Sequence, residues 1–200
     1  MIANDGQINY CVRWESDVSV SAQDRANIAT AVEKQLGLWM NWLYGFEGFP
    51  YTSVPVKVVG WAVRDANLLQ GDTSNIKVYI DTDADGIPQC AESCGRFFHQ
   101  DNNYSGCAAG ADNHYGQFIQ ISLRFRTHIL MHVLTDMSLW LTEGFEGGAG
   151  GDWGQRISRE YFMDLVNSGE ESIHILLHEM GHTFALDGAI VCAPSKNVLS

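Results

Sequence analysis

The sequence predicts an α/β fold, and three observations support this prediction. A long amphipathic helical pattern lies near the start of the chain, short segments rich in β-branched residues follow it, and an apolar helical pattern lies near the end. With 200 residues, six Trp, seven Tyr and nine Phe, the chain has enough apolar material for a sizeable core. We therefore expect residues 1–200 to form a single domain.

The first elements follow from the spacing of apolar and turn-forming residues. A helix is predicted over residues 22–43, because apolar side chains recur there at helical spacing and Ser21 and Asp24 resemble a capping box. Gly45 and Gly48 are expected to end this helix. Strands are predicted at residues 10–14, 54–63 and 76–80.

The second half of the chain is expected to alternate loops with helices. Residues 81–115 show little periodicity and are predicted to form a long loop. The glycine-rich segment 144–154 contains no Lys or Arg that could hold a phosphate, so a flexible turn is expected there. Helices are predicted at residues 155–166 and 173–186, the second of them strongly apolar.

The formal net charge of -12 argues against several kinds of partner. Phosphate binding needs clustered Lys and Arg, so neither nucleic acid nor an anionic membrane surface is expected as a partner. Residues 118–134 are the best candidate for a membrane span, but they contain two Arg and two His. Residues 1–7 are polar and show no signal peptide. We expect a monomer with no membrane partner.

The chain contains five cysteines, three of them in a loop rich in Gly, Asn and Asp. This spacing favours disulfides over a zinc ribbon, which uses two Cys-x-x-Cys pairs. Two disulfides are expected among Cys11, Cys90, Cys94 and Cys107, with the pairing left open, and Cys192 remains as the odd cysteine. Because disulfides form in oxidising compartments, we expect an extracellular protein.

Residues 178–182 read HEMGH and match the pattern HExxH. His178 and His182 are four residues apart, so on a helix both imidazoles can reach one zinc ion. Glu179 is expected to act as general base toward water whose pKa the metal lowers to about 7. The alternative is a buried helix with two hydrogen-bonded histidines, in which an unpaired Glu179 is costly. His174 would lie about 12 Å along the axis from His182 and is not expected to be a ligand.

These residues resemble the zincin peptidases, and within them the metzincin-like pattern HExxHxxGxx(H/D). Snapalysin-type bacterial enzymes show the version with Asp as third ligand. The segments CVRWESD, GRFFHQDNNYSGC and GFEGGAGGDWGQR are similar to a group of secreted fungal and bacterial HExxH proteins. The resemblance implies a zincin-like fold, with a twisted mixed sheet packed on the 22–43 helix and the HExxH helix. It also implies a secreted zinc metallopeptidase that hydrolyses peptide or protein substrates.

The chain departs from the metzincin pattern after its second histidine. Ala185 stands where the pattern has Gly, and Gly188 stands at the third-ligand position, so Asp187 is the nearest carboxylate for the metal. Metzincins also have a downstream Met-turn, and none of the twelve residues after Gly188 is Met. The C-terminal part of the zincin fold is therefore expected to be missing.

Residues 116–135 contain no acidic residue, although the chain has twice as many acids as bases. They separate two stretches that resemble the secreted group. We expect 116–135 to be an insertion and 188–200 a non-native tail, both derived from unspliced introns. The alternative is a native amphipathic helix at 118–134 and a short native tail.

A second metal pattern, D-x-D-x-D-G-x5-E, follows the third predicted strand. The expected calcium ligands are Asp81, Asp83, Asp85, the backbone carbonyl of Ile87, and Glu92. A strand rather than a helix precedes this loop, and Pro88 lacks the backbone N–H that such loops use for pairing. The alternative is therefore an Asp-Gly turn with solvated acids.

A different class of function also fits the composition. The chain could be a non-catalytic secreted protein that binds carbohydrate or cell wall through exposed Trp and Tyr. A coplanar exposed row of tryptophans favours binding, whereas their burial favours the enzyme. The tryptophans to compare are Trp39, Trp42, Trp61, Trp140 and Trp153.

Overall fold

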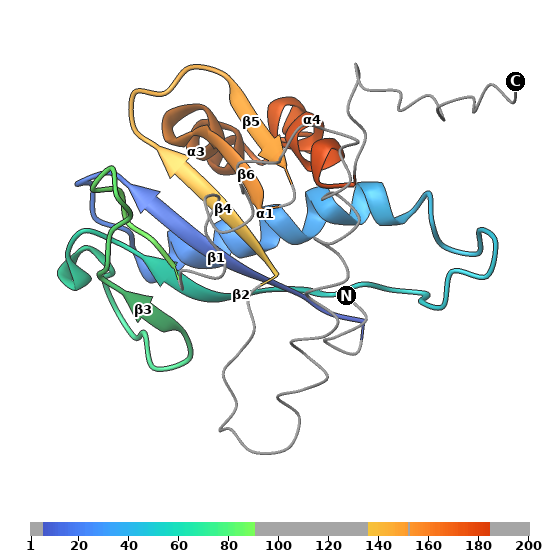
Figure 1. Cartoon of the computed structure of the whole chain (residues 1–200), viewed down its shortest axis with the longest axis horizontal. Coiled ribbons are helices and arrows are strands. Elements are labelled where there is room, and N and C mark those ends of the chain that lie inside the picture. The colour runs from blue at the N-terminus through green and yellow to red at the C-terminus, as the bar shows by residue number, and fades with distance from the viewer. Residues whose placement is uncertain (1–5, 91–135, 152, 185–200) are drawn as a thin grey trace, which may run out of the picture.

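The computed structural model describes residues 6–90, 136–151 and 153–184. Within these ranges the chain forms a six-stranded, mostly parallel sheet and three α-helices (Figure 1). The predicted α/β class is confirmed in this form. The suspected insertion at 116–135 and the tail at 188–200 lie outside the described residues.

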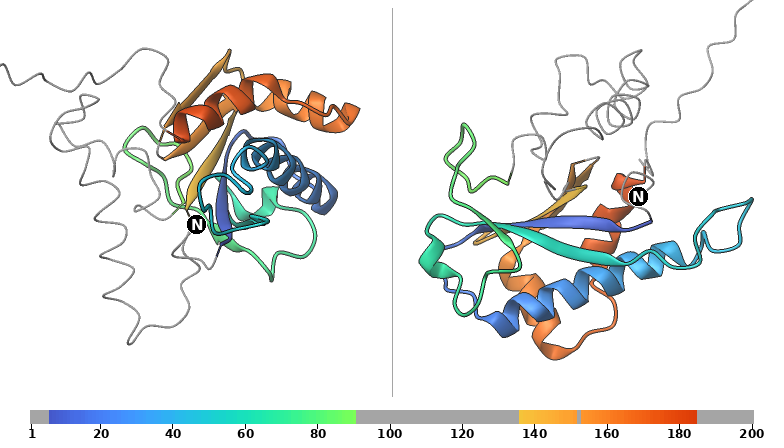
Figure 2. Two further views of the ribbon diagram at one scale, coloured as in Figure 1. Left: turned by 90° about the vertical axis from the view of Figure 1, so that its right-hand side faces the viewer. Right: turned by 90° about the horizontal axis from the view of Figure 1, so that it is seen from below.

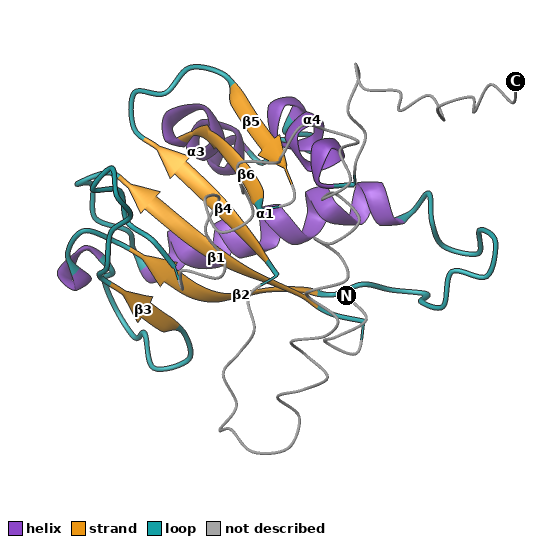
Figure 3. Ribbon diagram, in the orientation of Figure 1, coloured by secondary structure: helices purple, strands orange, loops and turns teal. Residues whose placement is uncertain are grey.

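The sheet has the strand order β3-β2-β1-β4-β6-β5. Its strands are β1 (Ile8–Glu15), β2 (Val56–Ala62), β3 (Lys77–Tyr79), β4 (Met137–Thr142), β5 (Gly148–Gly151) and β6 (Gly154–Ser158). All neighbouring strands are parallel except β5, which pairs antiparallel with β6 at one edge. The sheet is therefore mixed only at the edge formed by β5 (Figure 3).

Three helices pack against one face of the sheet (Figure 2). They are α1 (Ala22–Met40), α3 (Arg159–Ser168) and α4 (His174–Thr183). Helix α1 begins with a complete capping box, because Ser21 accepts from the Asp24 backbone N–H and the Asp24 side chain accepts from the Ser21 N–H. This part of the sequence-based prediction is confirmed.

The main core lies between the sheet and α1. Alternate residues of β1 face this core, because side chains on a strand point to opposite faces of the sheet in turn. Tyr10 and Val12 are fully buried and belong to the same core as Ile28 and Val32, which recur on α1 at the helical spacing that the sequence shows. The same central strand therefore presents its other residues to the opposite face of the sheet.

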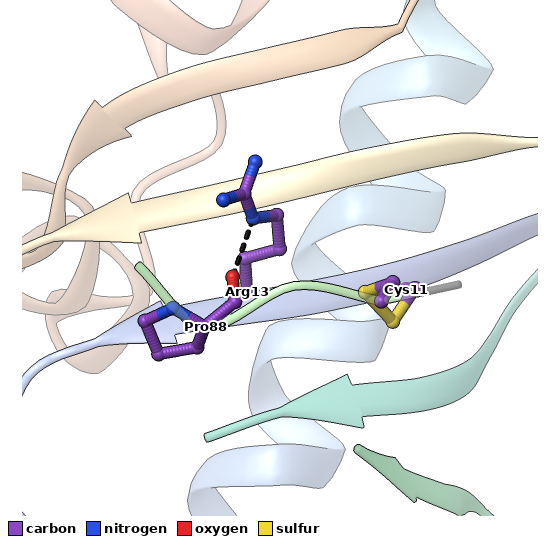
Figure 4. The surroundings of a disulfide bond; sticks show 4 residues. Cys11, Arg13 and Pro88 are labelled. Atoms are coloured by element: carbon purple, nitrogen blue, oxygen red, sulfur yellow. Dashed lines mark hydrogen bonds between the residues drawn. A yellow bond between two sulfur atoms is a disulfide. The ribbon is translucent and has the colours of Figure 1, made fainter. Parts of the chain in front are cut away.

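That opposite face carries a disulfide between Cys11 and Cys90 (Figure 4). Two residues further along β1, Arg13 binds the same loop: its Nε donates to the Pro88 carbonyl oxygen at 2.6 Å and its Nη2 pairs with Asp83 Oδ2 at 2.7 Å. The guanidinium also lies 4.2 Å from the centroid of the Trp140 ring. One strand thus ties residues 83–90 to the sheet by a covalent bond and by a buried cation.

The structure differs from the sequence prediction at the ends of elements. The first helix ends at Met40 rather than at residue 43, because the backbone N–H groups of Trp42 and Leu43 bond to carbonyls three residues back. Gly45 then adopts a φ of 78°, which suits glycine.

The prediction was wrong for two segments between residues 148 and 158. Residues 148–151 form strand β5 rather than a flexible turn, and residues 155–158 belong to β6 rather than to a helix. Helix α3 begins only after Ser158, whose side chain accepts a hydrogen bond from the Tyr161 N–H. Pairing with β4 outweighed the helical pattern over 155–158.

Among the described residues, the exposed large apolar side chains are Val18, Leu38, Trp42, Phe46 and Ile80. Trp42 and Phe46, just after α1, are 82% and 60% exposed. Within the described ranges, no helix has the length and apolar character needed to cross a membrane.

Candidate metal centre

Helix α4 places His178 and His182 side by side. Their Nε2 atoms lie 3.2 Å apart, and the ring centroids lie 4.9 Å apart. His178 is exposed and His182 is partly exposed, so an ion can reach both from solvent. The expected convergence of the two imidazoles is therefore present.

The distance between the two nitrogens fits a shared metal ion. Two ligands of a tetrahedral zinc ion with Zn–N bonds of about 2.0–2.1 Å lie about 3.3–3.4 Å apart. The observed 3.2 Å is close to this value. The pair can thus supply two zinc ligands with little rearrangement.

Glu179 lies beside the histidine pair but on the buried side of α4. The residue is 6% exposed, and its Oε2 lies 3.9 Å from His182 Nε2. Burial raises the pKa of this carboxyl above its usual value, while the positive charges that His178 and His182 can carry oppose this change. A carboxyl group in this position can exchange protons with a molecule bound at the histidines.

Two side chains of α1 hold the first half of α4. Ile173 precedes the helix and offers no side-chain cap, but its backbone N–H donates to Gln35 Oε1 at 2.9 Å. The Gln35 amide also donates to the Glu171 carbonyl oxygen at 3.1 Å. One turn later Trp39 Nε1 donates to the Leu177 carbonyl oxygen at 3.0 Å. These bonds fix the turn that precedes His178.

A buried polar chain holds the other end of α4. Tyr10 Oη donates to Gln155 Oε1 at 3.1 Å, and Gln155 Nε2 donates to Thr183 Oγ1 at 2.7 Å. Tyr10 and Gln155 are fully buried, and burial raises the pKa of the Tyr10 hydroxyl well above its usual value. The chain therefore links the central strand to the residue that directly follows His182.

The edge strand β5 approaches α4 very closely. A Cβ atom added at Gly150 would overlap the backbone carbonyl of Glu179, and one added at Gly148 would lie 2.5 Å from Glu179 Oε1. A pocket of about 560 Å³ opens beside this contact. Its lining residues are Gly147, Gly148, His174, Ile175, His178 and Glu179. His174 thus lines the same pocket as His178.

No third ligand completes the pair within the part of the chain that the structure describes. Among those residues, no group of three His, Cys, Asp or Glu is placed to hold a metal ion. Asp187, the nearest carboxylate by sequence, lies outside the described residues. The third ligand therefore stays a prediction.

The loop predicted to bind calcium forms a turn that its own side chain stabilises. Asp83 Oδ1 accepts from the backbone N–H groups of Asp85 and Ile87, each at 3.0 Å, and its other oxygen pairs with Arg13. Asp81 and Asp85 are exposed, and Glu92 lies outside the described residues. Arg13 thus already supplies the positive charge at Asp83, which weighs against an ion at this carboxylate.

The disulfide prediction is confirmed for one pair, Cys11–Cys90. This bond joins residues 79 positions apart, and it packs against Ala62 and Tyr79. Cys94 and Cys107 lie outside the described residues, so their pairing stays a prediction.

Three residues at the site were not singled out from the sequence. Gly148 and Gly150 lie two apart, the spacing that puts both on one face of a strand, but the strand itself was not predicted. Gln155 was assigned to a helix, and no local signal marks a residue whose partners are Tyr10 and Thr183.

No family model, curated protein or solved structure matches this chain. The case for a site at α4 therefore depends on the geometry of the residues themselves.

Proposed function

We propose that the chain is a secreted, zinc-dependent peptidase of the zincin type. In this proposal His178 and His182 hold the metal, Asp187 is the third ligand, and Glu179 is the general base. The observation that carries the proposal is the 3.2 Å separation of the two histidine Nε2 atoms beside a buried carboxyl group. Two neutral imidazoles and a nearby base that is not a ligand form the combination that this chemistry needs.

Zinc and Glu179 would have separate roles in peptide hydrolysis. Zinc, when bound, would polarise the peptide carbonyl and make water more acidic. Glu179 would accept a proton from the attacking water and pass it to the leaving amine. Its burial supports this role, because a raised pKa makes the carboxylate a stronger base toward the proton of the attacking water.

The position of β5 supports a peptide as the substrate. Among the described strands β5 is the last of the sheet on the side of α4, so one of its edges has no partner strand there. An extended peptide can pair with the free backbone groups of such an edge. Gly147 lines the pocket, and the space where its side chain would stand is open, which leaves room for a chain on this side of the pocket.

The tryptophans do not support the alternative of carbohydrate binding. Trp14, Trp61, Trp140 and Trp153 are buried, and Trp39 is half-buried against α4. Only Trp42 of the six is exposed, so an exposed row is not formed. The disulfide supports the extracellular location that we propose.

Hydrolysis of a mixed peptide library by the zinc-loaded protein tests the proposed function. We expect cleavage that a chelator stops and that zinc restores. The Glu179→Gln variant should retain zinc and lose cleavage by a factor of at least about 100, as expected for a missing general base. Glu170→Gln, which changes an exposed acid just before α4, is the matched control. Equal cleavage by the Glu179→Gln variant and the wild type would refute the proposal.

A further inference from the structure

Gly148 lies where strand β5 meets the carboxyl group of Glu179. A Cβ atom at this position would lie 2.5 Å from Glu179 Oε1, 2.7 Å from its Cγ and 2.6 Å from Cγ2 of Ile175. Real Cβ atoms essentially never approach another heavy atom closer than 3.0 Å. Any side chain at residue 148 would therefore displace at least one of these groups.

The backbone does not itself require glycine at residue 148. The φ angle of Gly148 lies outside the left-handed region, whereas the adjacent Gly147 has a φ of 90°. A Cβ at Gly147 would meet nothing within 4 Å. Glycine is therefore suited to the two positions for different reasons. Gly147 allows the positive φ of the turn, whereas Gly148 leaves space for the side chains of Glu179 and Ile175.

The atoms that would give way at Gly148 all belong to side chains. Oε1 and Cγ of Glu179 and Cγ2 of Ile175 must each move beyond 3.0 Å from the new methyl group, which requires new rotamers of Glu179 and Ile175. At Gly150 the atoms in the way belong to the backbone of Glu179, so the whole of α4 would have to move. Alanine at these two positions should therefore have different consequences.

We infer that Gly148 is a positioning residue, and that its missing side chain sets where the Glu179 carboxylate stands relative to the histidine pair. The inference rests on the proposed function for its catalytic consequence. The contact itself is a property of the folded chain and can be measured without any activity.

A double-mutant cycle between Gly148→Ala and Glu179→Ala measures the contact. Thermal unfolding of the full chain is followed with zinc and with a chelator. We expect Gly148→Ala to lower the melting midpoint by about 2–12 °C, the range for overpacking in a protein of this size. In the Glu179→Ala background the shift should be smaller, because the crowded carboxylate is gone and only the contact with Ile175 remains. Gly37→Ala, at an open position of α1 with ordinary φ, is the control and should not lower the midpoint.

Peptide hydrolysis by the zinc-loaded variants measures the consequence. Gly148→Ala should keep one zinc per chain and a KM within about threefold of wild type, while kcat falls by about 10–100-fold. Gly150→Ala should instead lose both stability and zinc.

The possible results separate the inference from the proposed function. An equal fall in the melting midpoint in both backgrounds would overturn the contact, and an unchanged kcat in the Gly148→Ala variant would overturn the positioning role. If the wild type binds no zinc and cleaves no peptide, the proposed function fails, and a coupled unfolding cycle still assigns Gly148 the placement of the carboxylate.

Discussion

Replacing Gln155 by Leu should destabilise the protein strongly, because Gln155 joins two buried hydroxyl groups. The variant has a similar volume but neither accepts from Tyr10 Oη nor donates to Thr183 Oγ1. The Thr183 hydroxyl can turn to a helix carbonyl, whereas the Tyr10 hydroxyl stays a buried donor without an acceptor. A stranded donor costs about 1–3 kcal/mol and a lost hydrogen bond about 1 kcal/mol. We therefore expect unfolding to become easier by about 2–4 kcal/mol, or about 4–16 °C in the melting midpoint.

Denaturant unfolding of Gln155→Leu, Tyr10→Phe and the double variant tests this reasoning. The double variant has no stranded donor, so its loss should be smaller than the sum of the single losses by about 1–3 kcal/mol. Zinc affinity should also fall more in Gln155→Leu than in Tyr10→Phe, because only Gln155 contacts the residue after His182. If the stability losses of the two single variants add up to that of the double variant within about 0.5 kcal/mol, the three residues do not act as a connected hydrogen-bonded chain.

Three further predictions concern the cysteines and the loop that contains Asp81 and Asp83. Removing the disulfide by Cys11→Ala should cost up to about 4.5 kcal/mol by the chain-entropy relation for its 79-residue separation, measured by denaturant unfolding, and a cost below about 1 kcal/mol would contradict this. Thiol counting on the denatured, unreduced chain should find at most one free thiol, and four or five would reject both disulfides. If the loop containing Asp81 and Asp83 binds calcium, it should do so only at about 0.1–1 mM, with a rise in melting midpoint that Asp81→Asn removes. No rise at about 10 mM calcium would exclude the site.

Local patterns in the sequence were enough to predict the main helix and the histidine pair. The apolar residues from Ile28 to Leu36 recur at helical spacing because they face the core that α1 shares with the sheet, and the capping signal at Ser21 is local. His178 and His182 converge because a helix brings residues four apart together. These features need no information from distant parts of the chain.

The contacts that complete the site come from distant residues and could not be predicted in the same way. Gln155 bonds to Thr183 across 28 positions and to Tyr10 across 145. The segment around Gly148 and Gly150 resembles a flexible turn in sequence, and only the approach of α4 explains its glycines. Tertiary packing, rather than local preference, made this segment a strand.

The partners of Arg13, on the other face of the sheet, could not be predicted from neighbouring residues either. Its side chain is buried, yet nothing near it in sequence provides its partners, which are Pro88 and Asp83. The sequence pattern therefore assigned Asp83 to calcium, while the fold brings a guanidinium to it.

The zinc content of the purified protein tests the central claim most directly. Elemental analysis of the wild type, His182→Ala and Glu179→Gln, each dialysed against the same trace of zinc, compares the two histidine ligands with the base. We predict one zinc per chain in the wild type and in Glu179→Gln, and a large loss in His182→Ala, because one imidazole cannot replace two converging ones. A wild-type protein without metal, or equal zinc in wild type and His182→Ala, would contradict the account.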